Sequence, residues 1–158
     1  MVNKMPSAET NEVIYYNSLY RHGVDEKRRV QIPAKWLPKT GEVEFTVILW
    51  PKNKEGVCLR VMPLQKMAEL LASIDAMPNS DPQKTVLKRV IGSKSDQVMV
   101  DKGGRICLPE EMAAGAGIKG EAMLVGLLDR FEIWNPAAHA KLQASDEVLS
   151  HEAFKLME

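Results

Sequence analysis

The sequence predicts an α+β, β-rich protein that is built from two copies of one small half. The strongest observation is an internal repeat: residues 25–33 (DEKRRVQIP) and 101–109 (DKGGRICLP) share the pattern Asp-x-x-x-Arg, aliphatic, x, aliphatic, Pro, 76 positions apart. A second similarity follows in the same order, between residues 59–62 (LRVM) and 131–134 (FEIW). The third observation is the alternation of apolar and polar residues beside these segments, which is typical of half-buried strands.

Each half is expected to contain a strand, a loop, a short strand, a helical turn and two further strands. In the second half, residues 98–100 form an apolar strand that enters the loop, and residues 105–108 alternate with a period of two. Pro33 and Pro109 are expected in the first turn of a short helix. The closing strand pairs are predicted at residues 45–50 with 57–62 and at residues 122–127 with 130–134.

Helices are predicted between the halves and after the second half. Apolar residues recur at helical spacing over residues 64–74, residues 77–80 interrupt this pattern, and Asp81-Pro82 begins a second helix. We expect this apolar stripe to belong to the core rather than to a cofactor site. Asn135-Pro136 is a further helix start, and residues 149–156 are expected to form only a marginal helix.

These elements divide the chain into five expected segments. They are a disordered N-terminal extension (1–15), a first half (16–76), a helical bridge (77–93), a second half (94–144) and a C-terminal tail that is mainly acidic (145–158).

Composition favours a cytoplasmic protein. The chain of 158 residues is 45% hydrophobic and 27% charged, which is ordinary for a soluble globular protein. No apolar run approaches the roughly 20 residues of a transmembrane helix, and residues 1–11 lack the apolar stretch of a secretory signal. Cys58 and Cys107 lack C-x-x-C spacing, so we expect reduced thiols.

The sequence contains no recognisable catalytic or metal-binding pattern. His22, His139 and His151 have no Cys, Asp or Glu partner at metal-ligand spacing. Phosphate-binding glycine loops and the common hydrolase motifs are also absent from the sequence. We therefore expect no enzymatic activity, no cofactor, no metal and no small-molecule substrate.

The two Asp-x-x-x-Arg loops are the candidate binding site. An arginine at a tight turn can form paired hydrogen bonds to a phosphate or to guanine O6 and N7. The alternative is an internal ion pair, Asp25 with Arg29 and Asp101 with Arg105, that only shapes the turn. Zero net charge is unusual for a nucleic-acid binder, although residues 21–29 and 84–105 are locally basic. The residues alone leave both interpretations open.

At these positions the sequence resembles the MraZ family, part of the wider AbrB-like superfamily of swapped-hairpin DNA-binding proteins. The second half is the closer match, and the first half matches less tightly. The resemblance covers roughly residues 16–143. The matching segments are residues 25–35 and 56–59 in the first half, and residues 91–93, 98–109, 124–126 and 129–134 in the second.

The resemblance implies two AbrB-like swapped-hairpin halves that form an intramolecular pseudo-dimer around a barrel-like core with peripheral helices. It also implies protomers that assemble into a ring, and a nucleoid-associated regulator of transcription. The expected partner is double-stranded promoter DNA upstream of the bacterial division and cell-wall gene cluster, bound through several short tandem elements. The expected DNA contacts are Arg29 and Arg105 first, then Asp25, Lys27, Arg28, Asp101 and Lys102.

One position departs from the family pattern. The family usually has Gly immediately before the Arg of each loop; Gly104 follows this pattern, whereas Arg28 does not. A non-glycine residue at positive φ is disfavoured by about 1 kcal/mol or more, so the first loop is expected to adopt another shape. Arg28 is then expected to contact a phosphate.

Two alternatives to this function remain. One is a ring-forming protein-interaction module whose loops bind another protein, which the balanced net charge favours. The other is an antitoxin-type AbrB-like repressor, although such chains usually contain one half rather than two. A salt titration of DNA binding separates the first alternative from a DNA-binding protein.

Overall fold

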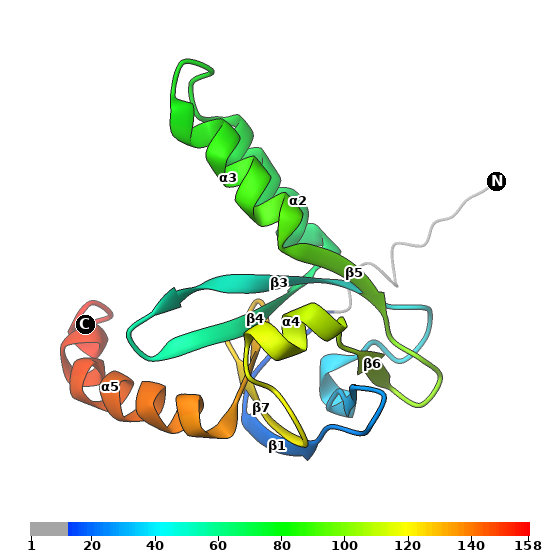
Figure 1. Ribbon diagram of the computed structural model, residues 1–158. Helices are drawn as coiled ribbons and strands as arrows, with labels where there is room; N and C mark the ends of the chain where they lie inside the picture. The colour runs from blue at the N-terminus through cyan, green and yellow to red at the C-terminus, as the bar shows by residue number, and fades with distance from the viewer. Residues whose placement is uncertain (1–12) are drawn as a thin grey trace.

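The computed structural model describes residues 13–158, so residues 1–12 of the expected N-terminal extension lie outside the described part. The described chain is a mixed α+β structure rich in strands, as predicted (Figure 1). In chain order its elements are β1 (Leu19–Gly23), β2 (Arg29–Gln31), the 3-10 helix η1 (Ala34–Trp36), β3 (Glu44–Asn53), β4 (Gly56–Pro63), α2 (Leu64–Asp75), α3 (Pro82–Ser93), β5 (Ser95–Met99), β6 (Arg105–Cys107), α4 (Glu110–Gly115), β7 (Glu121–Gly126), β8 (Phe131–Trp134) and α5 (Pro136–Lys155).

Strands from both halves form a single antiparallel sheet. Its order is β1-β7-β8-β4-β3-β5, while β2 and β6 form a separate two-stranded ribbon. In the repeat, β1 corresponds to β5, β3 to β7 and β4 to β8. When each strand is replaced by its counterpart, the same order results, read from the other edge of the sheet. The first strand of each half pairs with the other half, β1 with β7 and β5 with β3, and β4 pairs with β8 in the middle. Within residues 13–158 the sheet is not closed and ends at β1 and β5, so neither the expected barrel-like core nor the expected swapped-hairpin pseudo-dimer is confirmed.

An aromatic cluster forms the centre of the core. The Phe131 ring lies 4.8 Å from Trp36, 5.4 Å from Phe45 and 5.6 Å from Tyr16, measured between centroids. The buried aliphatic residues of the ribbon, Val30 of β2 among them, join the same cluster. The β2–β6 ribbon is therefore anchored to the core, while the loops that precede its two strands remain at the surface.

The helices begin where their capping residues predict. Asp81 caps α3 by accepting a hydrogen bond from the backbone N–H of Gln83 (2.9 Å), and Asn135 caps α5 in the same way. Helix α5 continues to Lys155, so the expected marginal helix near the C-terminus is instead part of one long helix. Pro33 and Pro109 are the N-cap residues of η1 and α4, one position before the predicted first turn.

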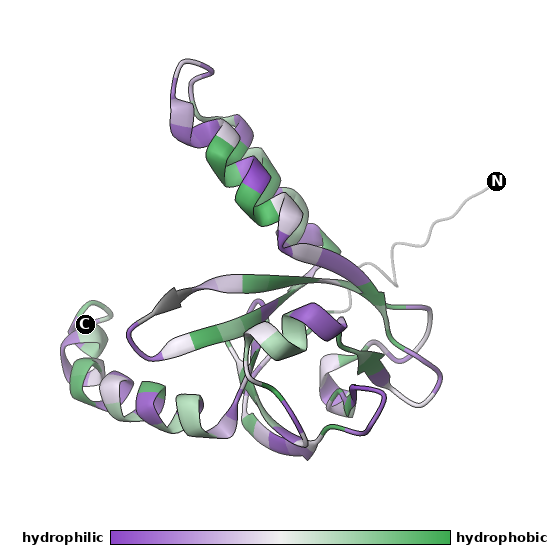
Figure 2. Cartoon of the chain, in the orientation of Figure 1, coloured by the Kyte–Doolittle hydropathy of each residue, from purple (hydrophilic) through white to green (hydrophobic). Residues whose placement is uncertain are grey.

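The apolar stripe of α2 and α3 lies largely outside the core, contrary to the prediction. The two helices form a hairpin that projects from the sheet (Figure 1), and Figure 2 colours segments of both helices green, as apolar residues. Ile74 is the buried member of the stripe. Five apolar side chains of the hairpin are between 38% and 51% exposed: Leu64, Leu71, Val86, Leu87 and Val90. Helical periodicity predicts an apolar face, but it does not say whether that face is covered by the same chain.

Candidate nucleic-acid interface

The ribbon places the two Asp-x-x-x-Arg loops side by side at one end of the molecule (Figure 1). Strands β2 and β6 pair antiparallel, with Val30 opposite Ile106. Two hydrogen bonds extend this pairing into the loops: Ile32 N–H donates to the Gly104 carbonyl and Leu108 N–H donates to the Arg28 carbonyl, both at 2.9 Å. The donors are equivalent in the repeat, as are the acceptors, so each loop is held by the opposite half.

An aspartate organises each loop from within. Asp25 Oδ1 accepts hydrogen bonds from the backbone N–H groups of Lys27 (2.9 Å) and Arg29 (2.8 Å). Asp101 Oδ1 accepts from Gly103 and Arg105 at 2.9 Å. The pKa of each aspartate is lowered below its ordinary value of 3.8. The main cause is the hydrogen bond from a backbone N–H to the carboxylate, from Arg29 to Asp25 and from Arg105 to Asp101. The two turns therefore share one internal hydrogen-bond pattern.

The leading candidates, Arg29 and Arg105, are paired with these aspartates. Arg29 Nε lies 2.7 Å from Asp25 Oδ2, and Arg105 Nε lies 3.3 Å from Asp101 Oδ2. The internal ion pair considered from the sequence is thus present in both loops. It occupies one edge of each guanidinium; within residues 13–158 the terminal nitrogens of Arg29 and Arg105 make no hydrogen bond. These side chains are 35% and 38% exposed, so their free donors remain accessible to an external acceptor.

Arg28 does not change the shape of the first loop, contrary to expectation. Its φ is +63°, in the same left-handed region as Gly104 at +82°. The Asp25 hydrogen bonds and the ribbon pairing impose this conformation, and Arg28 gains a compensating bond from its Nε to the Leu108 carbonyl at 2.9 Å. The half-buried Arg28 side chain therefore links the two halves, and the same link directs its guanidinium toward the opposite strand.

Lys27 and Lys102 lie at the tips of the two loops, at positions that differ by one residue in the repeat: Lys27 matches Gly103, and Lys102 matches Glu26. Both residues are exposed, and neither ammonium group has a hydrogen-bond or ion-pair partner among the described residues. Together with Arg29 and Arg105, they give each loop one cationic tip and one guanidinium with free donors. This arrangement suits an anionic ligand that extends across both loops.

Two positions of the ribbon were not identified from the sequence. Gln31 Nε2 donates to the carbonyls of Gly103 (3.0 Å) and Gly104 (3.1 Å) in the second loop. Cys107 Sγ donates to the Lys27 carbonyl in the first loop at 3.2 Å. Gln31 and Cys107 are equivalent in the repeat, and the side chain of each donates a hydrogen bond to the loop of the other half. The 76-residue offset was the available signal, since both are exposed positions between buried aliphatic residues.

The histidines and acidic residues of residues 13–158 were also compared with the geometry of a metal site. No three His, Cys, Asp or Glu side chains of this part gather closely enough to hold a metal ion. His22 stacks on Tyr20, with centroids 6.0 Å apart. Among the same residues, no helix combines the length and apolar character needed to cross a membrane.

Comparison with known proteins gives consistent matches. A family model described as "MraZ protein, putative antitoxin-like" matches residues 92–156. A protein of Thermomicrobium roseum named transcriptional regulator MraZ is 32% identical over 133 residues, which cover 80% of this chain and 88% of the relative. Proteins with the same name from Rhodospirillum rubrum (32% identical, 75% and 78% covered) and Rickettsia felis (30% identical, 85% and 91% covered) match similarly.

Proposed function

This chain belongs to the MraZ family, and from that premise we propose that it is a transcriptional regulator that binds double-stranded DNA through its two Asp-x-x-x-Arg loops. The observation that supports this most is the β2–β6 ribbon, which presents two loops of equivalent geometry at one end of the molecule. Both loops offer guanidinium donors that no residue of the described chain satisfies. Arginine donors in this state suit phosphate oxygens and the major-groove edge of guanine.

We assign different roles to the loop residues. Arg29 and Arg105 are the leading contacts, and each is held in orientation by its aspartate. Lys27 and Lys102 supply phosphate contacts, which add affinity without sequence preference. A phosphate contact by Arg28 would use its terminal nitrogens, because its Nε bonds to Leu108.

We further propose that binding depends on assembly. The two halves act as a pseudo-dimer, and several protomers form a ring that repeats the loops at fixed spacing. Because the chain has zero net charge, one protomer attracts DNA only weakly. Each further engaged loop binds at high effective concentration, and avidity can exceed single-site affinity by about a hundredfold. The proposed target is promoter DNA with short tandem elements, upstream of the division and cell-wall gene cluster, bound in the cytoplasm at the nucleoid.

The direct test replaces the loop arginines and measures affinity for the DNA upstream of the chain's own gene. Arg105→Ala and Arg29→Ala should each weaken specific binding by about tenfold or more while thermal stability stays near that of the parent. Arg21→Ala is the matched control, because Arg21 is also an exposed arginine in an ion pair (2.8 Å to Glu121) but lies on β1. Unchanged DNA affinity in both loop variants would refute the proposed contact.

One observation favours a second function, a protein-interaction module, and that is the zero net charge. A salt titration separates the two functions. Binding through phosphate contacts weakens linearly on a logarithmic scale with salt, and each lost phosphate contact lowers the slope by about one. An absence of DNA binding even at low salt would favour the protein-interaction module.

A further inference from the structure

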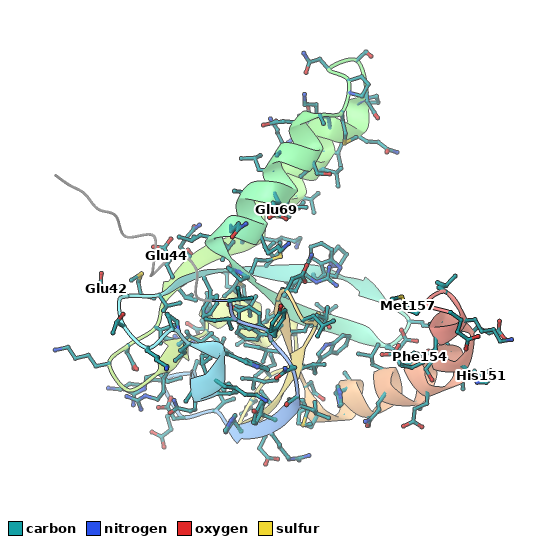
Figure 3. The ribbon with its side chains drawn as sticks, turned by 180° about the vertical axis from the view of Figure 1, so that it is seen from behind. Glu42, Glu44, Glu69, His151, Phe154 and Met157 are labelled. Atoms are coloured by element: carbon teal, nitrogen blue, oxygen red, sulfur yellow. The ribbon has the colours of Figure 1, made fainter. Side chains whose placement is uncertain are left out.

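A groove lies between helix α5 and the ends of strands β1 and β7, apart from the proposed DNA interface. Its volume is about 380 Å³, within the size range of small-ligand sites. Figure 1 shows α5 on the side of the molecule away from β6, and Figure 3, seen from behind, shows the same helix with His151, Phe154 and Met157 near its end. A ligand in this groove therefore leaves both Asp-x-x-x-Arg loops accessible.

The groove is lined by a buried histidine whose ring is free to bind. His139 is only 6% exposed, and within residues 13–158 its imidazole makes no hydrogen bond. Buried polar side chains are normally hydrogen-bonded, so the ring nitrogens of His139 are available to a ligand. Burial lowers the pKa of His139 below its ordinary 6.5, and the neutral ring keeps one nitrogen as an acceptor. The charge of Asp146 acts on this pKa in the opposite direction, which means that it stabilises a positive charge beside the ring.

The charged side chains that line the groove are both acidic. They are Asp146 and Glu147, which are exposed and have no ion-pair partner in the described part of the chain. They follow His139 by about two helical turns, so the three side chains lie on one face of α5. By the same spacing, Lys141 and Lys155 lie on the opposite face of the helix and do not neutralise the groove.

The cations of the neighbouring strand side already have partners. Arg21 of β1 pairs with Glu121 at 2.8 Å. The Lys35 ammonium donates to Ser18 Oγ at 2.7 Å and lies 5.8 Å from the centroid of the Tyr20 ring. Tyr20 packs against the core, so Lys35 approaches β1 from the core side, whereas the groove lies on the other face of the strand. The groove therefore attracts a cation.

The remaining walls of the groove include aliphatic side chains. Leu19 of β1 lies opposite Val125 of β7 in the strand register, and Leu142 of α5 faces them across the groove. Leu19 is 43% exposed, so a ligand that covers it gains apolar contact. An aliphatic stem suits these walls, and a cationic head with N–H donors suits the histidine and the two carboxylates.

We propose that this groove binds an alkylammonium group, which is a primary amine cation on an aliphatic stem. The stem packs between α5 and the two strands, and the ammonium donates to the His139 ring in the field of Asp146 and Glu147. Two sources supply this group, a free polyamine and a lysine side chain of another protein. The inference goes beyond the proposed function and uses none of its DNA contacts.

The test is isothermal titration calorimetry of the full-length protein with butylammonium, and with butanol as the uncharged ligand of similar stem. Butylammonium should bind about tenfold more tightly than butanol, because only the cation forms a charged hydrogen bond. Asp146→Asn and Glu147→Gln should each raise the Kd for butylammonium by about threefold. His139→Phe keeps a ring and removes the acceptor, and it should also raise the Kd by about threefold or more.

Glu152→Gln is the matched control. It changes the net charge by the same amount as Glu147→Gln, but on the opposite face of α5, so its Kd should stay within about twofold of the parent. If His139→Phe fails to fold, the two exposed acidic positions still decide the question. Equal Kd values for butylammonium and butanol would overturn the proposal. Parental Kd values in both Asp146→Asn and Glu147→Gln, or an equal loss in Glu152→Gln, would also overturn it.

Two further probes distinguish the sources of the ammonium group. Putrescine represents a free polyamine, and Nα-acetyl-lysine methylamide represents a lysine side chain within a protein. Tighter binding of putrescine supports a polyamine site, and tighter binding of the lysine probe supports a site for a partner's lysine. Failure of both probes to bind would overturn the proposal, whatever the outcome of the DNA-binding tests.

Discussion

Gly104→Ala is the substitution that most directly tests how the second loop is built. Gly104 has φ +82°, and a Cβ at this position would lie 2.7 Å from Gln31 Nε2. An alanine in the left-handed region costs about 1–2 kcal/mol. The flexible Gln31 side chain can move away, but it then loses its bonds to the Gly103 and Gly104 carbonyls, at about 0.5 kcal/mol each for an exposed site.

The reduced flexibility of the unfolded chain offsets about 0.5 kcal/mol of this loss, so Gly104→Ala should lower the free energy of unfolding by about 2 kcal/mol. Gly103→Ala is the matched control. Gly103 is not at positive φ, and its nearest neighbour would be Asp101 Oδ1 at an ordinary 3.4 Å. This control should therefore stay within about 0.5 kcal/mol of the parent.

Urea denaturation of the two variants measures the difference, provided that the slope against denaturant is unchanged. The Gln31→Ala background adds a second test. With the glutamine absent, Gly104→Ala should cost only the backbone contribution of about 1–2 kcal/mol, so the two substitutions should be less than additive. Equal effects of Gly103→Ala and Gly104→Ala, or full additivity with Gln31→Ala, would refute this account of the loop.

Three further predictions concern the loops and the core. Arg28→Gly removes the left-handed strain of about 1 kcal/mol, but it also removes the hydrogen bond to the Leu108 carbonyl, so the two effects nearly cancel. The free energy of unfolding in urea should therefore change by less than about 1 kcal/mol, and a loss above about 2 kcal/mol would contradict this balance. The pKa values of Asp25 and Asp101 are lower in the folded protein than the ordinary 3.8. The two carboxylates therefore stabilise the fold above pH 3.8, and this stabilisation is lost as the pH falls through their pKa values in the folded state. Replacing both with Asn should therefore flatten the acid limb of the stability–pH curve, and an unchanged limb would contradict the assignment. Phe131→Ala should cost about 3–5 kcal/mol in thermal or urea unfolding, because the ring is fully buried among aromatic side chains, and a cost below 1 kcal/mol would contradict its central place.

Local features of the fold were predictable from the sequence because they depend on residues close together in the chain. Asp81 and Asn135 cap helices through bonds to N–H groups two or three residues later. Asp101 forms its turn through the backbone of Gly103 and Arg105, which the Asp-x-x-x-Arg spacing indicated. The repeat offset likewise identified the two loops as equivalent, and the structure brings them together on one ribbon.

The predictions that were wrong concerned neighbours distant in sequence. Arg28 was expected to change its loop, since local sterics disfavour positive φ for arginine. The Leu108 carbonyl that accepts its Nε belongs to the other half, 80 positions away. Helical periodicity predicts that the apolar stripe of α2 and α3 belongs to the core, yet Val86 and Val90 are exposed on the hairpin.

The sequence by itself determined the repeat, the strand-rich character, the helix starts and the equivalence of the two Asp-x-x-x-Arg loops. Only the tertiary structure decided that each half supplies strands to the other, that Gln31 and Cys107 each hydrogen-bond to the loop of the opposite half, and that the apolar stripe of α2 and α3 is largely exposed. The physical reason is the range of the interactions. Caps and turns close over a few residues, so their partners stand beside them in the chain. Strand pairing and burial depend on which distant segments meet once the chain has collapsed, and apolar periodicity is the same whether or not a helix packs against the core of its own chain.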